Sequence, residues 1–230
     1  MRKWTTMVAL SVMAMSGYAQ ATNGAAAEQN LEEIGDGIAF RSFDNRYEGT
    51  KGSPMLFEQF QKASIELSDG KAFENVYVNI DFYQNKVFVN RTSQVIEPNV
   101  AVSKVEFADS KKIFVSGKDL GDSGIFMAEL LSSGDVNLYA VRGKKFLKAS
   151  YTGAYSANKP YDEFIDKTSY YVQKKEGQLM PFKAKKKSLL EYVPMSKKEL
   201  SDYLLKENMD LGNEKDLVRF FNYVNYGIFN

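Results

Sequence analysis

The tetrapeptide Gly121-Asp122-Ser123-Gly124 is the first stretch whose residue types could do covalent chemistry. It matches the motif around the nucleophilic serine of trypsin-like proteases, in which a histidine is the base that activates the serine. The chain contains no histidine and no cysteine. Because a serine without a base is a weak nucleophile at neutral pH, we predict that this tetrapeptide is only a tight polar turn.

The absence of these two residue types also excludes disulfides, a thiol nucleophile, a histidine general base and nearly all zinc and copper sites. Asp119 and Asp122 suggest an oxygen-only calcium loop, but the twelfth position from Asp119 is Leu130, where such a loop needs glutamate. No glycine-rich phosphate-binding motif stands at a strand-to-helix junction. The sequence therefore predicts no metal site and no cofactor.

Carboxylates remain as a source of acid–base chemistry, as in the glycoside hydrolases that use a pair of them. The acidic residues considered for such a pair are Glu58, Glu66, Glu74, Asp81 and Glu129. Sequence does not show which of them face each other. A carboxylate-dependent glycan hydrolase is thus the alternative to a non-catalytic role.

Residues 73–92 carry the clearest periodic signal, an alternation of apolar with polar or aromatic side chains. The alternation predicts a β-hairpin, with a turn at Gln84 and Asn85 and with Phe82 opposite Val87. One face is predicted core, and the other carries Tyr77, Asn79, Asp81, Tyr83, Phe88 and Asn90. Aromatic and amide groups together bind small polar ligands or sugars, so this face is the predicted ligand-binding site, with a covered or solvated face as the alternative.

Further strand signals recur about every ten residues between turn residues. The predicted strands cover residues 64–67, 72–83, 86–92, 100–107, 112–116, 126–131, 136–140, 144–148, 169–173 and 179–182. Residues 150–167 are expected to form a loop-like insertion. This pattern predicts an antiparallel meander that closes as a sandwich or an open barrel.

The apolar period changes from two to that of a helix after the last strand. A short helix is predicted around Leu189, and a capping box at Ser196 and Glu199 predicts the start of a second helix. A third helix is predicted from about Glu214, with an apolar stripe formed by Leu217, Phe220, Phe221 and Val224. These stripes need cover, so we predict an α+β fold whose C-terminal helices pack on the sheet.

The N-terminus has the features of a secretory signal. Arg2 and Lys3 precede an apolar run, and small residues at 17 and 19 suit cleavage. We predict a signal peptide at 1–19, a flexible leader at 20–37, an antiparallel β body at 38–183 and a helical segment at 184–230. No later stretch approaches the roughly 20 apolar residues of a membrane helix.

Charge is distributed unevenly along the chain, although the formal net charge is only +1. This near-neutral total indicates no nucleic-acid partner. Residues 142–187 carry twelve basic against four acidic side chains, a local excess of eight. We predict a basic stripe, with Lys183, Lys185, Lys186 and Lys187 docking on a polyanionic glycan or anionic lipid; lysines that protect a strand edge are the alternative.

Five local patterns follow one another along the chain: the secretory signal, Phe73-Glu74-Asn75-Val76, Tyr170-Tyr171-Val172, a lysine-rich Ser188-Leu189-Leu190 helix and Phe220-Phe221-Asn222-Tyr223. In this order the chain resembles uncharacterised exported proteins of Bacteroidota type. The resemblance covers most of the mature chain and implies export to the periplasm or cell surface. It implies no reaction. We therefore predict a non-catalytic envelope protein with a binding or structural role.

Overall fold

The computed structural model describes residues 47, 49–91, 94–150, 161–175, 177–193 and 195–227. The predicted signal peptide and leader lie outside these residues. The described strands are β1 (Gln61–Leu67), β2 (Ala72–Asp81), β3 (Lys86–Arg91), β4 (Gln94–Ile96), β5 (Val102–Phe107), β6 (Ile113–Ser116), β7 (Met127–Ser132), β8 (Val136–Leu147), β9 (Glu163–Lys174) and β10 (Met180–Phe182). The helices are α2 (Lys186–Leu189), α3 (Lys197–Lys206) and α4 (Glu214–Tyr226).

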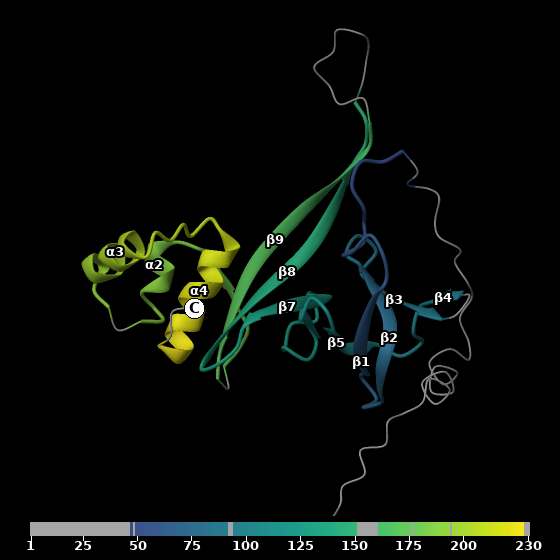
Figure 1. The fold of residues 1–230 in the computed structure, drawn as a ribbon, viewed down its shortest axis with the longest axis horizontal. Coiled ribbons are helices and arrows are strands. Elements are labelled where there is room, and N and C mark those ends of the chain that lie inside the picture. The colour runs from purple at the N-terminus through teal and green to yellow at the C-terminus, as the bar shows by residue number, and fades with distance from the viewer. Residues whose placement is uncertain are drawn as a thin grey trace, which may run out of the picture.

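These strands form one open sheet in the order β10-β9-β8-β7-β6-β5-β1-β2-β3-β4, and each neighbouring pair is antiparallel (Figure 1). The chain runs from β1 to β4 toward one edge, returns to the other side of β1 with β5, and then proceeds in sequence to β10. The sheet is thus a meander interrupted once. The predicted α+β class, with an antiparallel sheet followed by helices, is confirmed.

The β2–β3 hairpin has a longer turn than its sequence suggested. Asp81 pairs with Lys86, so residues 82–85 make a four-residue turn. The Asp81 carboxylate stabilises this turn, because its Oδ1 accepts hydrogen bonds from the backbone N–H groups of Tyr83 at 2.8 Å and Gln84 at 2.7 Å. The predicted register was wrong by two residues, a shift that leaves the paired side chains on their predicted faces but moves Phe82 and Tyr83 from the strand into the turn.

The predicted boundaries of β8 and β9 were also wrong. A break was expected near Gly143, yet Gly143 pairs with Lys167 inside a continuous twelve-residue register. A Cβ at Gly143 would meet nothing closer than 3.7 Å, so glycine neither bends nor opens the strand. β9 begins at Glu163, within the predicted loop, because β8 offers a partner along its whole length. Residues 151–160 of that loop lie outside the described part.

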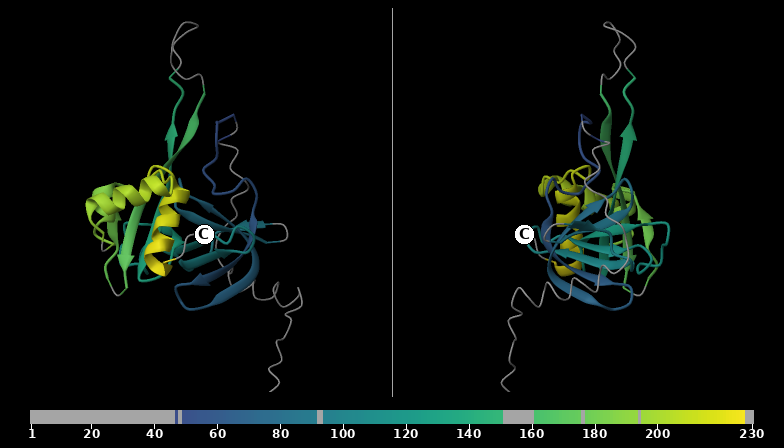
Figure 2. Two further views of the ribbon diagram at one scale, coloured as in Figure 1. Left: turned by 60° about the vertical axis from the view of Figure 1, so that its left-hand side comes forward. Right: turned by 90° about the vertical axis from the view of Figure 1, so that its right-hand side faces the viewer.

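Apolar side chains gather in three clusters. Strands β1 to β7 share the largest cluster, which contains Ile65, Val78, Phe107 and Phe114. A second cluster fills the space between β8–β10 and the helices, which gather at that end of the sheet (Figures 1 and 2). A smaller third cluster surrounds Tyr139. The helices pack on one end of the sheet, whereas the β1–β4 end packs around the first apolar cluster.

Local signals account for the helices. The predicted capping box is present at α3, where Ser196 and Glu199 exchange side-chain and backbone hydrogen bonds. Helix α4 is further attached through Asn225, whose side chain bonds to both the N–H and the carbonyl of Val136 in β8. Among the described residues, no helix is long and apolar enough to span a membrane.

We predict that Phe221→Ala lowers the free energy of unfolding by about 3–5 kcal/mol, because the Phe221 side chain is fully buried between α4 and the sheet. The matched control is Leu205→Ala on α3, since Leu205 is 82% exposed. That variant should change stability by less than about 0.5 kcal/mol. Urea unfolding of the three proteins is the measurement, and equal midpoints for wild type and Phe221→Ala would contradict the prediction.

Candidate functional site

The predicted ligand-binding face of the β2–β3 hairpin is partly covered. Asn79 and Asp81 are each only 2% exposed. The Asn79 side chain makes two hydrogen bonds to the chain segment before β1. Its Nδ2 donates to the Phe57 carbonyl at 2.8 Å, and its Oδ1 accepts from the Phe57 N–H at 3.2 Å. Asp81 stabilises the turn. Both polar groups therefore bind backbone and are not presented to a ligand.

The other four predicted residues do not form one surface either. Tyr77 is 54% exposed and stands opposite the exposed Asn90 in the hairpin register. Phe88 is half-buried opposite Asn79. Tyr83 lies beyond the strand, in the turn. The structure thus brings Tyr77 and Asn90 together, and it separates them from the remaining members of the predicted site.

Tyr83 belongs instead to a cluster of four aromatic rings with Tyr47, Phe146 and Phe164. All six ring pairs have centroids between 5.0 and 6.2 Å apart. The rings come from the segment before β1, the β2–β3 turn, β8 and β9. Phe146 lies near the end of β8 and Phe164 near the start of β9, and this part of the two strands is here called the distal β8–β9 ribbon. Edge-to-face packing of this kind stabilises the contact of the distal ribbon with the β2–β3 turn and with the segment before β1. The rings pack on one another rather than forming an open platform for a ligand.

The principal polar network of the described residues centres on Arg142. Its Nε donates to Glu129 Oε2 at 2.7 Å, and its two terminal nitrogens donate to the Glu214 carboxylate at 2.7 and 2.8 Å. Lys112 pairs with the second oxygen of Glu129, and the Tyr170 hydroxyl donates to Glu214 at 3.0 Å. The network joins the β5–β6 turn, β7, β8 and β9 to the first residue of α4.

Proton affinities in the network follow from these contacts. Burial opposes ionisation of Glu214, but the hydrogen bonds and charge of Arg142 outweigh it and hold the pKa of Glu214 below its usual value. Burial and the neighbouring Glu214 raise the pKa of Tyr170 to about 12. Glu129 and Glu214 face each other only across a shared guanidinium. This arrangement stabilises the ionised form of Glu214 and gives the buried Glu129 two cationic partners.

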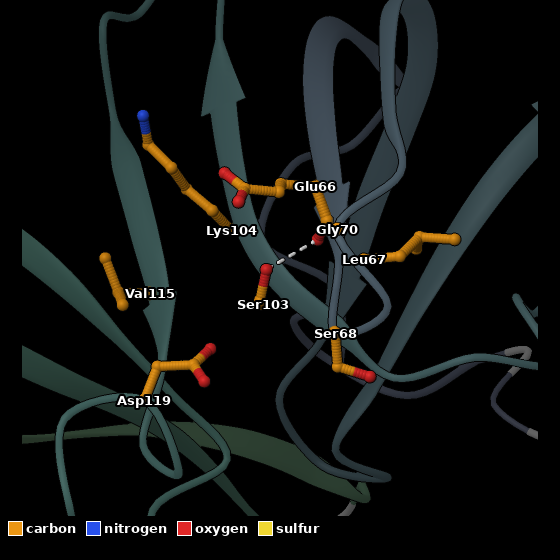
Figure 3. Close-up of a pocket in the computed structure, with 8 residues that line it drawn as sticks. All are labelled: Glu66, Leu67, Ser68, Gly70, Ser103, Lys104, Val115 and Asp119. Atoms are coloured by element: carbon orange, nitrogen blue, oxygen red, sulfur yellow. Dashed lines mark hydrogen bonds between the residues drawn. The ribbon is translucent and has the colours of Figure 1, made fainter.

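A separate cleft of about 340 Å³ lies where β1, β5 and β6 meet the turns at their ends (Figure 3). Glu66, Lys104 and Val115 stand in a row across these three strands, as the registers Glu66 to Lys104 and Lys104 to Val115 require. The remaining lining residues are Leu67, Ser68, Gly70, Ser103 and Asp119.

The cleft in Figure 3 holds two carboxylates at opposite ends, Glu66 and Asp119, with the Ser103 hydroxyl between them. Ser103 donates to the Glu66 carbonyl at 3.0 Å, and Lys104 pairs with Glu106 at 3.0 Å. Such a set of groups could bind a hydroxylated ligand. No sequence signal joins Glu66 and Asp119, because they are far apart in the chain and come to line one cleft only through the pairing of β1, β5 and β6.

The predicted basic stripe is divided in the structure. Arg142 is held between two glutamates, and Lys144 lies 2.6 Å from Asp166. Lys183, Lys185, Lys186 and Lys187, here named the lysine group, are exposed beside α2. No described acidic side chain lies within ion-pair distance of these four. Figures 1 and 2 place α2 apart from the distal β8–β9 ribbon, so the basic residues do not form one continuous surface.

Comparison of the chain with protein-family models, with curated proteins and with solved structures found no match. The geometry of the described residues is therefore the basis for the functional argument. Among those residues, no group of three or more acidic side chains gathers as a metal site would require.

We predict that Glu214→Gln lowers the free energy of unfolding by about 1–2 kcal/mol at neutral pH, because it removes one charge from the Arg142 network. The Glu214 side chain is 33% exposed, so solvent reduces the cost below that of a fully buried pair. Since the folded-state pKa is lowered, the contribution is complete above the unfolded value of about 4.3 and is lost as pH falls through the folded value.

Urea midpoints of wild type and Glu214→Gln, measured at neutral pH and near pH 3, test this prediction. The two proteins should differ at neutral pH and converge in acid. The control is Glu58→Gln, which removes an exposed carboxylate that has no ion pair with any described residue. A constant difference between wild type and Glu214→Gln at all pH values would show that charge is not the cause.

Proposed function

We propose that the chain is an exported, non-catalytic envelope protein that binds a polyanion, either an acidic glycan or an anionic lipid surface, through the lysine group. The observation that carries the proposal is the exposure of Lys183, Lys185, Lys186 and Lys187 with no described acidic partner. Four adjacent uncompensated ammonium groups attract a multiply charged anion. The secretory features at residues 1–19 and the resemblance to exported Bacteroidota proteins support an envelope location.

The use of buried polar groups supports a non-catalytic role. The buried polar residues of the described chain are Asn79, Asp81, Glu129 and Ser132. Asn79 and Asp81 bond to backbone, Glu129 is paired with two cations, and the Ser132 hydroxyl donates to Asn222 of α4 at 2.8 Å. Each of these groups has a structural partner. An acid–base site would need a buried group left for substrate.

The finer shape of the sheet is also part of the proposal. Of the two forms expected from the sequence, we favour an open barrel for β1–β7, because inward side chains from all seven strands share one apolar cluster. A single sheet face can enclose such a core only by curling. The lysine group then lies on the helical end, outside the curled part.

We predict that replacing the four lysines of the lysine group with glutamine strongly weakens retention on a dextran sulfate column. Wild-type retention should fall steeply with salt, because screening shortens to about 8 Å at physiological ionic strength. The matched control replaces four exposed lysines elsewhere, Lys62, Lys71, Lys111 and Lys118, and loses the same charge. Equal retention of the two variants would contradict a local site, and no retention of wild type at low salt would contradict polyanion binding.

A carboxylate-dependent glycan hydrolase is the second candidate, and the cleft in Figure 3 is the observation in its favour. Two carboxylates on opposite sides of a glycosidic bond are the usual requirement of that chemistry. Against it, Glu66 and Asp119 are both exposed to solvent. The other acids considered are also unsuitable, since Asp81 and Glu129 have structural partners, and Glu58 and Glu74 lie exposed outside the lining of this cleft.

We expect no hydrolysis when the wild-type protein is incubated with a panel of fluorogenic aryl glycosides, because both carboxylates of the cleft are exposed to solvent. Glu66→Gln and Asp119→Asn are the matched variants. Hydrolysis by wild type that disappears in both variants would overturn the non-catalytic proposal and establish the second candidate.

A further inference from the structure

We infer that the polyanion bound by the lysine group is the surface of an anionic phospholipid bilayer rather than a soluble glycan. This inference rests on the proposed function and deepens it. It depends on a larger surface, here named the docking face, which consists of the lysine group with Lys174, Lys175, Met180 and Tyr192. The docking face combines positive charge with apolar and aromatic groups in one place.

Strand pairing places Lys174 on this surface, and Lys175 follows it directly after the end of β9. β10 pairs with the end of β9, with Met180 opposite Val172. Lys174 lies two residues after Val172 and therefore points to the same side of the sheet as Met180. Lys174 and Lys175 are both exposed, and no described acidic side chain lies within ion-pair distance of them. Six lysines are thus contributed by the end of β9 with the residue after it, by the segment that follows β10, and by α2.

Met180 is the apolar member of the docking face. It is 59% exposed, although it stands opposite the buried Val172 and two residues before the buried Phe182. Its side chain extends from the helical side of the sheet edge toward solvent. A glycan sulfate or carboxylate gains nothing from a thioether at this position. A bilayer does, because apolar side chains beside lysines enter the boundary between headgroups and acyl chains.

Tyr192 gives the docking face the aromatic group that is typical of membrane interfaces. The Lys174 ammonium lies 5.3 Å from the centre of the Tyr192 ring, and the ring also contacts Phe182 and Phe221. Tyr192 therefore has one side on the core and one side under a lysine. Tyrosine prefers such a position, in which an apolar ring and a polar hydroxyl meet the headgroup level.

The alternative use of this edge, the addition of a strand from another chain, is disfavoured by its sequence. The centre of β10 is Pro181, which has no N–H to donate to an incoming strand. β10 is also only three residues long. The lysines are therefore more than protection of an edge, because the edge is already protected by its proline and its length.

The test compares two ligands: vesicles of phosphatidylcholine with and without phosphatidylglycerol, and soluble dextran sulfate. We expect wild type to bind the phosphatidylglycerol vesicles and not the pure phosphatidylcholine vesicles. Replacing the lysine group with glutamine should weaken vesicle binding by roughly 10²–10³-fold, at about 1 kcal/mol for each lysine near an anionic surface.

Met180→Ser distinguishes lipid from glycan. It should weaken vesicle binding by about three- to ten-fold, because an apolar contact is lost, and leave dextran sulfate binding unchanged. The control Ile165→Ser removes another exposed apolar side chain, in the distal half of β9, and should affect neither ligand. Circular dichroism of each variant verifies that the fold is retained.

The outcomes separate the two proposals. Wild-type binding to dextran sulfate without binding to phosphatidylglycerol vesicles would overturn the lipid inference and leave polyanion binding in place. Vesicle binding that Met180→Ser does not change would also overturn it, because charge alone would then explain the affinity. Binding to neither ligand at low salt would overturn both the inference and the proposed function.

Discussion

Arg142 makes the contact on which the arrangement of the two halves of this protein depends. Its guanidinium takes one carboxylate from β7 and another from the first turn of α4, and so it connects the sheet to the helical layer. Glu129 is 3% exposed, and without Arg142 its charge would be buried with Lys112 as its only ion-pair partner among the described residues. A charge left in that position costs several kcal/mol. The helices are therefore held by the network as well as by the apolar cluster beneath them.

The network and the apolar cluster act at different places on α4. Leu217, Phe220 and Phe221 are buried against β8–β10, and Asn225 near the other end bonds to the β7–β8 turn. The helix is thus attached at its start, along its apolar face and close to its end. Helices α2 and α3 share the apolar cluster with α4, and the Tyr203 ring of α3 contacts the rings of Phe220 and Tyr223 in α4. The lysine group is therefore carried by a helical layer that is attached to the sheet through α4.

Charge compensation separates structural from exposed basic residues. Arg142 and Lys144 have carboxylate partners at 2.7 Å or less, and their positive charge is neutralised within the fold. The lysines beside α2 have no such partner among the described residues. Arg142 and Lys144 are thus used within the fold, while the lysine group remains available to an external anion. A count of lysines and arginines along the chain does not make this distinction.

The sequence by itself determined the secondary structure that rests on local physics. The capping box at Ser196, the apolar stripe through Phe221 and the alternation that predicts the β2–β3 hairpin each depend on neighbours within a few positions. The structure has the capping box, the buried stripe and the hairpin, the last with a longer turn than predicted. The absence of histidine and cysteine likewise set the limits of the chemistry.

Only the tertiary structure decided which of these residues stay open to a ligand. Asn79 and Asp81 were expected on an open face, but the segment at Phe57 covers the first and a four-residue turn uses the second. Glu66 and Asp119 line the same cleft although they are distant in the chain, and Arg142 bonds to Glu214 across 72 positions. Alternation assigns a side chain to one face of a strand, whereas the elements that later pack on that face determine its exposure. That packing depends on contacts between distant residues, which no local pattern contains.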